Sequence, residues 1–302
     1  MISSITSSTK AQYTSSWKLW WKYCHEKAFD FYNANVNNIL DFLSNCYRLG
    51  SSYGTLNSHR SAISLINTNK VSEDERLKRF FRGIFKLRPT FPKYNVTWNP
   101  NIVLDYLSGL CNETINLELL TKKTVMLLAL ASGQRIQTLS LVKTHNIKVY
   151  SDKIIIIIDD LVKTSGIGRA QPVLNLPFFV QNPNICPATT LQAYLNRTAD
   201  HRTGHSVLFT YKKPFRPAST QTIGRWLKET LSASGIDTTI FSAHSTRHAA
   251  TSSAARAGVS FDIIRKSAGW TEHSSIFANF YNRPIVDSDS NLLSNSQFVE
   301  QS

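Results

Sequence analysis

The feature that most constrains this fold is a proline-bearing interruption, TFPKYNVTWNP, which separates two segments of different character. Pro89, Pro92 and Pro100 break the helical pattern, because proline lacks a backbone N–H and the residue before it avoids the helical region. With 302 residues, the chain is long enough for two separate cores. We therefore place a domain boundary near residue 95, with one domain over 1–95 and a second over 96–285.

The segment before the interruption has helical periodicity from residue 8 to residue 88. Its first stretch, STKAQYTSSWKLWWKYCHEKAF, can be capped at Ser8 or Thr9 and repeats tryptophan at helical spacing. Two shorter stretches, NNILDFLSNCYRL and TLNSHRSAISLI, are separated by the turn-prone GSSYG. The pattern predicts an all-α first domain.

The last helix expected in this domain, DERLKRFFRGIFKLRP, has an apolar face and a separate basic ridge. The ridge consists of three cations spaced one helical turn apart: Lys78, Arg82 and Lys86. A basic ridge on a packed helix suits contact with a phosphate backbone, so these residues are candidate DNA contacts. A charge run is also typical of an ordinary solvated face, and both interpretations stay open.

The segment after the interruption alternates between helical and strand-like stretches. NLELLTKKTVMLLALAS and TQTIGRWLKETLSASG predict helices, whereas KVYSDKIIIIIDD and QPVLNLP predict strands. Residues 207–211 are a further candidate strand. The Ser- and Asn-rich end, residues 286–302, is expected to be a disordered tail. The second domain is thus predicted to mix helices and strands.

The charge balance indicates the chemical class of the partner. The chain has 34 Lys and Arg against 20 Asp and Glu, a formal net charge of +14. Such an excess indicates a phosphate-rich partner, with nucleic acid first and an anionic membrane surface second. No membrane span is expected, because the longest apolar runs, VMLLALA and IIIII, fall far short of the roughly 20 residues required. The scattered cysteines contain no CxxC pair and predict reduced thiols.

The stretch AHSTRHAATSS places two histidines and an arginine close together. His244 and His248 are four apart and would share a helix face, as zinc-binding pairs do. The metalloprotease pattern needs a Glu where this chain has Ser245, and Arg247 between the histidines would repel a cation. We therefore expect no metal. The remaining alternatives are a structural pair and phosphate chemistry, in which Arg247 grips oxygens bidentately and His244 moves a proton.

Three other stretches of the second domain carry residues suited to the same phosphate chemistry. Arg135 in ASGQRIQTLSLV follows an apolar helix, where its guanidinium can emerge at the next helix start. Lys163 in DLVKTSGIGRAQPVLNLP lies between the strand-like runs, at a possible hairpin tip. Trp270 and Tyr281 follow in SAGWTEHSSIFANFYNRP. Together these stretches supply further cations and a candidate nucleophile.

In this order and context, the residues resemble the tyrosine recombinases, also called the phage integrase family. The resemblance covers residues from about 1 to 285 and assigns six catalytic positions: Arg135, Lys163, His244, Arg247, Trp270 and Tyr281. It implies the α-rich tyrosine recombinase fold, an all-α core-binding domain followed by a mixed α+β catalytic domain with a small antiparallel sheet. The motifs GQR, HSTRH, KSAGW and FYNRP are most similar to Crypton and DIRS-type recombinases of eukaryotic mobile elements. One departure is Thr138, where bacterial relatives usually carry an acidic residue.

The resemblance implies a reaction in which a tyrosine cleaves DNA and leaves a 3′-phosphotyrosine, which a 5′-hydroxyl of another strand then resolves. Tyr281 would be the nucleophile, and His244 its general base. Arg135 and Arg247 would hold the non-bridging oxygens, and their permanent charge would let the enzyme work without a metal. Lys163 would protonate the leaving 5′-oxygen.

Two aromatic side chains have less specific expected roles. Trp270 can donate its indole N–H to a phosphate oxygen or pack the pocket. His248 is expected to be structural support, since His244 already occupies the catalytic position.

The function implied by the resemblance is site-specific DNA recombination in the integration or excision of a mobile element, located in the nucleus and needing no cofactor. The expected partner is double-stranded DNA, with a homo-tetramer joining two DNA sites and no membrane involved. Two alternatives stay open. One is an element-derived DNA-binding regulator without catalytic activity, and the other is a type IB topoisomerase, which shares the chemistry.

Overall fold

The computed structural model describes residues 5–69, 71–202, 204–270 and 281–286. The chain divides into two compact units, Met1–Pro92 and Lys93–Ser302. The expected boundary near residue 95 lies just beyond this division. The expected disordered tail lies outside the described residues, apart from its first residue.

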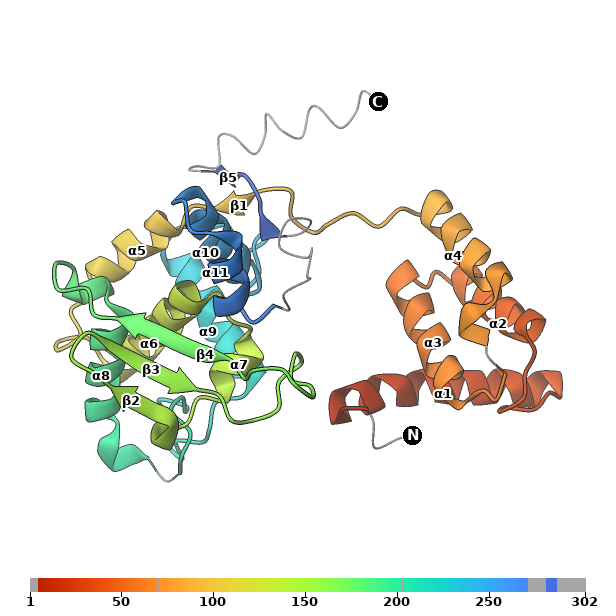
Figure 1. The fold of residues 1–302 in the computed structure, drawn as a ribbon, viewed down its shortest axis with the longest axis horizontal. Coiled ribbons are helices and arrows are strands. Elements are labelled where there is room, and N and C mark those ends of the chain that lie inside the picture. Colours follow the sequence, from red (N-terminus) through yellow and green to blue (C-terminus); the bar gives the residue numbers. More distant parts are fainter. Residues whose placement is uncertain (1–4, 70, 203, 271–280, 287–302) are drawn as a thin grey trace. The chain divides into compact units, whose positions relative to one another are not determined.

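The described part of the first unit contains only helices and turns: α1 (Ser7–Lys27), α2 (Val36–Arg48), α3 (Tyr53–Ile66), the short 3₁₀ turn η2 (Val71–Glu73) and α4 (Glu75–Leu87) (Figure 1). Each α-helix is preceded by a polar side chain that accepts a hydrogen bond from an N–H of the first turn: Thr6, Asn35, Ser52 and Asp74. The apolar faces meet around Trp20, whose buried indole donates to the carbonyl of Phe31 (3.1 Å). The predicted all-α character of this segment is confirmed.

Helix α6 is the central element of the second unit. The α-helices of this unit are α5 (Pro100–Ser108), α6 (Leu117–Ser132), α7 (Ile136–Ser140), α8 (Pro187–Arg197), α9 (Thr220–Ala233), α10 (Ser245–Arg256) and α11 (Phe261–Ser267). Helix α6 is buried along most of its length and contacts α8, α9 and α10. A helix that is apolar almost all round belongs in a core, because it has no face to present to water. Its C-terminal end therefore has a fixed position in the fold.

A small antiparallel sheet packs on this helical core, in the order β2 (Ile147–Val149), β3 (Lys153–Ile157) and β4 (Val173–Pro177) (Figure 1). Ile154 pairs with Leu176, and Ile156 with Leu174, and all four side chains are buried. Alternate residues point the other way, as strand geometry requires. The predicted fold class, an all-α segment followed by a mixed α+β segment with a small antiparallel sheet, is confirmed.

A second, two-stranded pairing joins the beginning and the end of the second unit. Strand β1 (Thr97–Trp98) runs parallel to β5 (Ile285–Val286), and both contact α10. The short 3₁₀ turns of this unit are η3 (Thr144–Asn146), η4 (Pro183–Ile185) and η5 (Ala199–His201).

The candidate strand at 207–211 is not a strand. Only isolated bridges occur in this region, between Lys143 and Ser206 and between Phe209 and Pro217. Pro217 has no N–H to donate to a ladder, which explains why the pairing does not extend.

Three of the four cysteines are part of the hydrophobic cores of the two units. None of the described helices is long and apolar enough to cross a membrane. The four cysteines are unpaired, with Cys24, Cys46 and Cys186 buried and Cys111 partly buried. Burial raises the pKa of the Cys24 thiol to about 11, so this side chain acts as a small apolar group.

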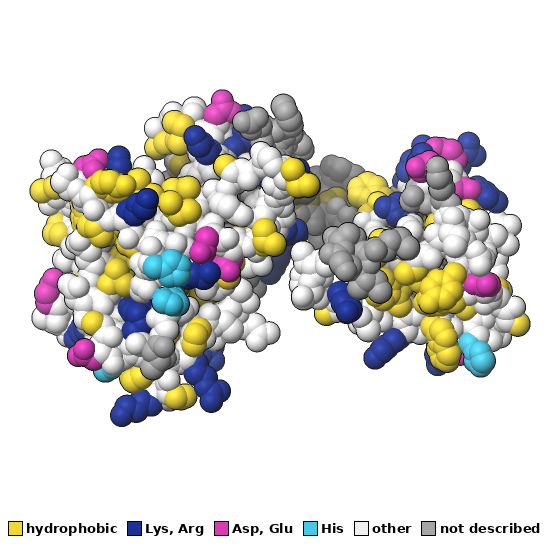
Figure 2. Space-filling model, turned by 60° about the horizontal axis from the view of Figure 1, so that its bottom comes forward, with side chains coloured by type: hydrophobic (Ala, Val, Ile, Leu, Met, Phe, Trp, Pro, Cys, Tyr) yellow, Lys and Arg dark blue, Asp and Glu magenta, His cyan; other side chains and the backbone are white. Residues whose placement is uncertain are grey.

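The positive charge is distributed over the surface. Figure 2 shows Lys and Arg side chains spread over the visible face of both units rather than gathered in one patch. Each unit therefore presents cations that can attract a polyanion.

The central position of α6 predicts a large cost for truncating its core-facing side chains. Leu128 is 0% exposed, so Leu128→Ala should lower the free energy of unfolding by about 3 kcal/mol, through lost burial and the cavity left behind. The measurement is urea denaturation of the full chain followed by circular dichroism. Leu161, which is 81% exposed, provides the matched control, and Leu161→Ala should change stability by about 0.5 kcal/mol or less. Equal effects of the two substitutions would contradict this account of the core.

Candidate active site

Arg247, in the first turn of α10, forms the centre of the candidate site. Its side chain is 3% exposed, and Nη1 donates to the carbonyls of Gly133 (2.6 Å) and Ala268 (2.7 Å). Gly133 is the C-cap of α6, and Ala268 is the C-cap of α11. Carbonyls at helix C-termini carry partial negative charge and stabilise a cation. Arg247 thus ties the ends of α6 and α11 to the start of α10.

Two glycines allow the backbone turns around Arg247 to pack closely. Gly133 has φ +59°, and a Cβ there would lie 3.1 Å from the Thr251 methyl carbon. Gly269 has φ +67°, and a Cβ there would lie 3.2 Å from Gln134 Oε1. The GQR turn after α6 therefore lies directly against the turn after α11. Arg135, the N-cap of α7, has Nη1 3.5 Å from the Gly269 carbonyl.

The Arg247 guanidinium has donors that the fold does not use. Its Nε and Nη2 are buried and form no hydrogen bond of good geometry within the described part of the chain. Burial, and then the charge of Arg135, lower the pKa of Arg247 to about 9, against an opposing effect of Tyr281. Buried donors without acceptors cost free energy, and an anionic acceptor would remove that cost.

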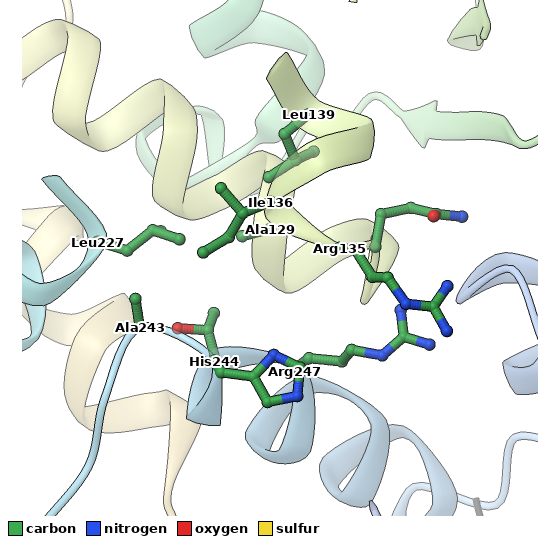
Figure 3. A pocket seen from close by; sticks show the side chains of 10 residues that line it. Ala129, Arg135, Ile136, Leu139, Leu227, Ala243, His244 and Arg247 are labelled. Carbon is green, nitrogen blue, oxygen red and sulfur yellow. The ribbon is translucent and has the colours of Figure 1, made fainter. Parts of the chain in front are cut away.

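A second guanidinium lies next to the first. Figure 3 shows the Arg135 and Arg247 guanidinium groups side by side, beyond the His244 ring. They line a small cavity of about 10 Å³, and none of the described residues in its wall is Asp or Glu. Thr138, three residues after Arg135, is buried. Two guanidinium groups without a carboxylate suit an anion with several oxygens, such as a phosphodiester.

Metal ligation has no support in the described part of the chain. Among those residues, no group of three or more His, Cys, Asp or Glu is placed to hold a metal ion.

Tyr281 lies in direct contact with His244. Its hydroxyl oxygen is 2.9 Å from His244 Nε2. The phenol ring stacks on His248, with centroids 4.2 Å apart and planes 21° apart, and the Trp270 ring lies at 4.9 Å in a tilted arrangement. Ser252 Oγ donates to the Tyr281 carbonyl. The side chain and the backbone of Tyr281 are therefore both held against α10.

The electrostatics of the site keep His244 neutral. Part of the ring is exposed to solvent, yet the protein packed around it lowers the pKa of His244 below 6.5, and Arg247, Arg135 and Lys93 lower it further. A neutral imidazole that carries its proton on Nδ1 has a free electron pair on Nε2. Nε2 can then accept the proton of the Tyr281 hydroxyl.

His248 and Trp270 both pack on the reactive groups. The contact of His248 with Tyr281 was missed by sequence reasoning, although the spacing from His244 already placed both histidines on one helix face. The Trp270 ring lies 4.2 Å from the Arg247 guanidinium carbon, so its aromatic face stabilises the cation.

Of the six candidate catalytic residues, Lys163 is the one that makes no contact with the other five in the described part of the chain. It lies on the loop between β3 and β4, as the hairpin expectation required, but it is exposed and has no hydrogen bond or ion pair to a described residue. The base of its loop is anchored, because Lys143 Nζ pairs with Asp159 (3.1 Å) and Asp160 (2.7 Å). The other five candidates lie together.

The basic ridge lies on the exposed side of α4 in the first unit. Glu75, in the first turn of α4, pairs with Lys78 (2.8 Å) and Arg82 (3.3 Å) and offsets part of their charge. Lys86 lies in the last turn of the same helix. DNA contact by these residues stays a prediction.

The charges around His244 give a pH prediction. In the free protein, the Cε1 NMR signal of His244 should titrate below pH 6.5, and Arg135→Ala should move the pKa upward because it removes a neighbouring cation. The unfolded chain binds a proton at His244 more tightly than the folded chain does. The free energy of unfolding should therefore decrease as the pH falls from 6.5 toward the folded-state pKa of His244. Arg225→Ala, whose charge pairs with Glu229 (3.6 Å), should leave the signal unchanged. A wild-type pKa above 6.5 would refute the burial argument.

Solved structures with the same fold include a site-specific recombinase and integrases. A XerH site-specific recombinase bound to difH substrate is 13% identical, with a TM-score of 0.56 over 89% of this chain and 72% of that chain. The Tn1549 transposon integrase in complex with circular intermediate DNA is 14% identical, with a TM-score of 0.54 over 89% and 86%. A lambda integrase tetramer bound to a Holliday junction is 16% identical, with a TM-score of 0.52 over 90% and 74%.

The sequence itself gives the family. No curated protein matches this chain. The phage integrase family matches residues 106–285, which include all six candidate catalytic positions and more than half of the chain. The chain therefore belongs to the phage integrase family, the tyrosine recombinases.

Proposed function

We propose that this chain cleaves and rejoins DNA through a covalent 3′-phosphotyrosine on Tyr281. The observation that carries the proposal is the Tyr281 hydroxyl, 2.9 Å from His244 Nε2, with the buried Arg247 guanidinium 5.3 Å from the Tyr281 ring centre. A nucleophile, a base and an anion-binding group in mutual contact are the parts that phosphoryl transfer requires.

In the cleavage step, the Tyr281 oxygen attacks phosphorus and its proton passes to His244 Nε2. The new bond joins phosphorus to the tyrosine oxygen, while the bond to the 5′-oxygen breaks. Arg135 and Arg247 bind the non-bridging oxygens, whose negative charge grows in the transition state. The departing 5′-oxygen needs a proton, and the exposed ammonium of Lys163 is the candidate donor.

Rejoining reverses these movements with a different strand. A 5′-hydroxyl attacks the phosphotyrosine and gives its proton to Lys163, the bond between phosphorus and the Tyr281 oxygen breaks, and the tyrosine recovers its proton from His244. One phosphoester bond is exchanged for another at each step, so the bond energy is conserved and ATP is not required.

The proposed partner is double-stranded DNA. A net charge of +14 and basic side chains on both units support this partner, as do the DNA-bound states of the three recombinases and integrases with the same fold. The lambda integrase tetramer on a Holliday junction supports a tetramer that joins two DNA sites. The basic ridge of Lys78, Arg82 and Lys86 is the proposed backbone contact of the first unit.

The proposed biological role is integration or excision of a eukaryotic mobile element, with the protein acting in the nucleus. This part of the proposal is supported by the similarity of GQR, HSTRH, KSAGW and FYNRP to Crypton and DIRS-type recombinases.

A suicide-substrate assay tests the proposed reaction. Duplexes with a randomised core are enriched for fragments that the wild-type protein binds, and are then nicked so that a cleaved strand end diffuses away. The wild-type protein should form an adduct that survives denaturing electrophoresis. Tyr281→Phe should form none, because it lacks the attacking oxygen, while it keeps its affinity for the same fragments.

Tyr150→Phe serves as the matched control, since Tyr150 is exposed, follows β2 and does not line the cavity, and its adduct should equal the wild-type one. Adduct formation by Tyr281→Phe would show that the nucleophile is wrong. Specific binding without any wild-type adduct would favour a non-catalytic regulator. Relaxation of supercoiled DNA without joining of two sites would favour a topoisomerase.

A further inference from the structure

The first residues of the second unit are built into the back of the candidate site. Residues 94–98, here called the strap, follow directly after the first unit, which ends at Pro92. Tyr94 is 6% exposed and Trp98 is 1% exposed, so both aromatic side chains are part of the fold of the second unit. The strap contacts the two segments that carry His244 and Tyr281.

On one side, the strap holds the turn that presents His244. Tyr94 Oη lies 2.7 Å from Ser242 Oγ and accepts a hydrogen bond from Ser242 N (3.0 Å). Trp98 Nε1 donates to Ser245 Oγ (2.8 Å), which in turn donates to the Ser242 carbonyl (2.7 Å). The residues on both sides of His244 are therefore fixed by side chains of the strap.

On the other side, the strap holds the segment that follows Tyr281. Thr97 N donates to the Pro284 carbonyl (2.7 Å), and the parallel pairing of β1 with β5 aligns Thr97 with Ile285. The Tyr94 ring also contacts His248 edge-on at 5.4 Å, and the His248 ring stacks on Tyr281 at 4.2 Å. Both the backbone after the nucleophile and the ring packed on it are in contact with the strap.

The contact between His244 and Tyr281 depends on two segments that are far apart in the sequence. Proton transfer needs the donor and acceptor atoms within hydrogen-bond reach, and a misplacement of about 1 Å can cost roughly a hundredfold in rate. In the described part of the chain, the strap makes hydrogen bonds to both segments. We propose that Tyr94 is a positioning residue, and that the strap sets the register of His244 against Tyr281 for the cleavage step. This inference rests on the proposed function.

Tyr94→Phe tests the positioning role, because it removes only the hydroxyl that contacts Ser242. Under single-turnover conditions with the suicide substrate, the cleavage rate constant should fall roughly tenfold to a hundredfold, with DNA affinity and melting temperature close to wild type. Ser242→Ala removes the partner Oγ from the opposite side and should slow cleavage in the same way. Tyr194→Phe is the matched control, since Tyr194 is fully buried in the core of the same unit, and its cleavage rate should be unchanged.

A measurement without DNA separates failure of the strap from failure of the proposed reaction. The Cε1 NMR signal of His244 in the free protein reports the packing around the ring, and in Tyr94→Phe its pKa should move toward 6.5 because the turn is released. If the wild-type protein forms no adduct, the proposed function is wrong. The His244 titration in Tyr94→Phe then still tests whether the strap positions His244. A wild-type cleavage rate or a wild-type His244 titration in Tyr94→Phe would overturn the inference, as would equal losses in Tyr94→Phe and Tyr194→Phe.

Discussion

The rest of the site depends on the buried Arg247 guanidinium and its two hydrogen bonds to the carbonyls of Gly133 and Ala268. Burying a charge is costly unless it is hydrogen-bonded, and here the acceptors are the orphan carbonyls at the ends of α6 and α11. This satisfies Nη1, whereas Nε and Nη2 have no hydrogen-bond partner of good geometry among the described residues. The fold thus holds an anion-binding group in place before any ligand arrives, which spares the reaction the cost of reorganisation.

The same cations control the proton chemistry. Burial, and then the charges of Arg247 and Arg135, lower the pKa of His244, which keeps the imidazole neutral and able to accept a proton. In the proposed reaction, one pair of guanidinium groups would therefore serve both phosphate binding and nucleophile activation. An acidic side chain in this cavity would weaken both, and the described residues that line it include no Asp or Glu.

Much of this site was predictable from the sequence, for a specific reason. Arg135, His244, Arg247, Trp270 and Tyr281 each lie in a short motif whose identity and order indicate the chemistry, and the apolar helix before GQR indicates where α6 ends. Helical periodicity likewise predicted the first unit, and the strand-like runs KVYSDKIIIIIDD and QPVLNLP predicted β3 and β4.

Contacts between segments that are distant in sequence were not predictable. The prolines marked residues 89–100 as a connection, but periodicity cannot reveal that Tyr94 bonds Ser242, which lies 148 residues away. The stacking of His248 on Tyr281 depends on the path by which the chain returns to α10. Residues 207–211 have the composition of a strand, yet their neighbour Pro217 cannot continue a ladder. The local sequence pattern predicts where helices and strands form. Which distant segments come into contact depends on how the whole unit packs.

The most direct measurement of the central claim is the identity of the residue that becomes attached to DNA. A trapped protein–DNA adduct is digested with nuclease and protease, and tandem mass spectrometry locates the residual nucleotide. The account predicts a 3′-linked nucleotide on the Tyr281 phenol oxygen and on no other residue. A nucleotide on a different side chain, or a 5′-linked one, would contradict it.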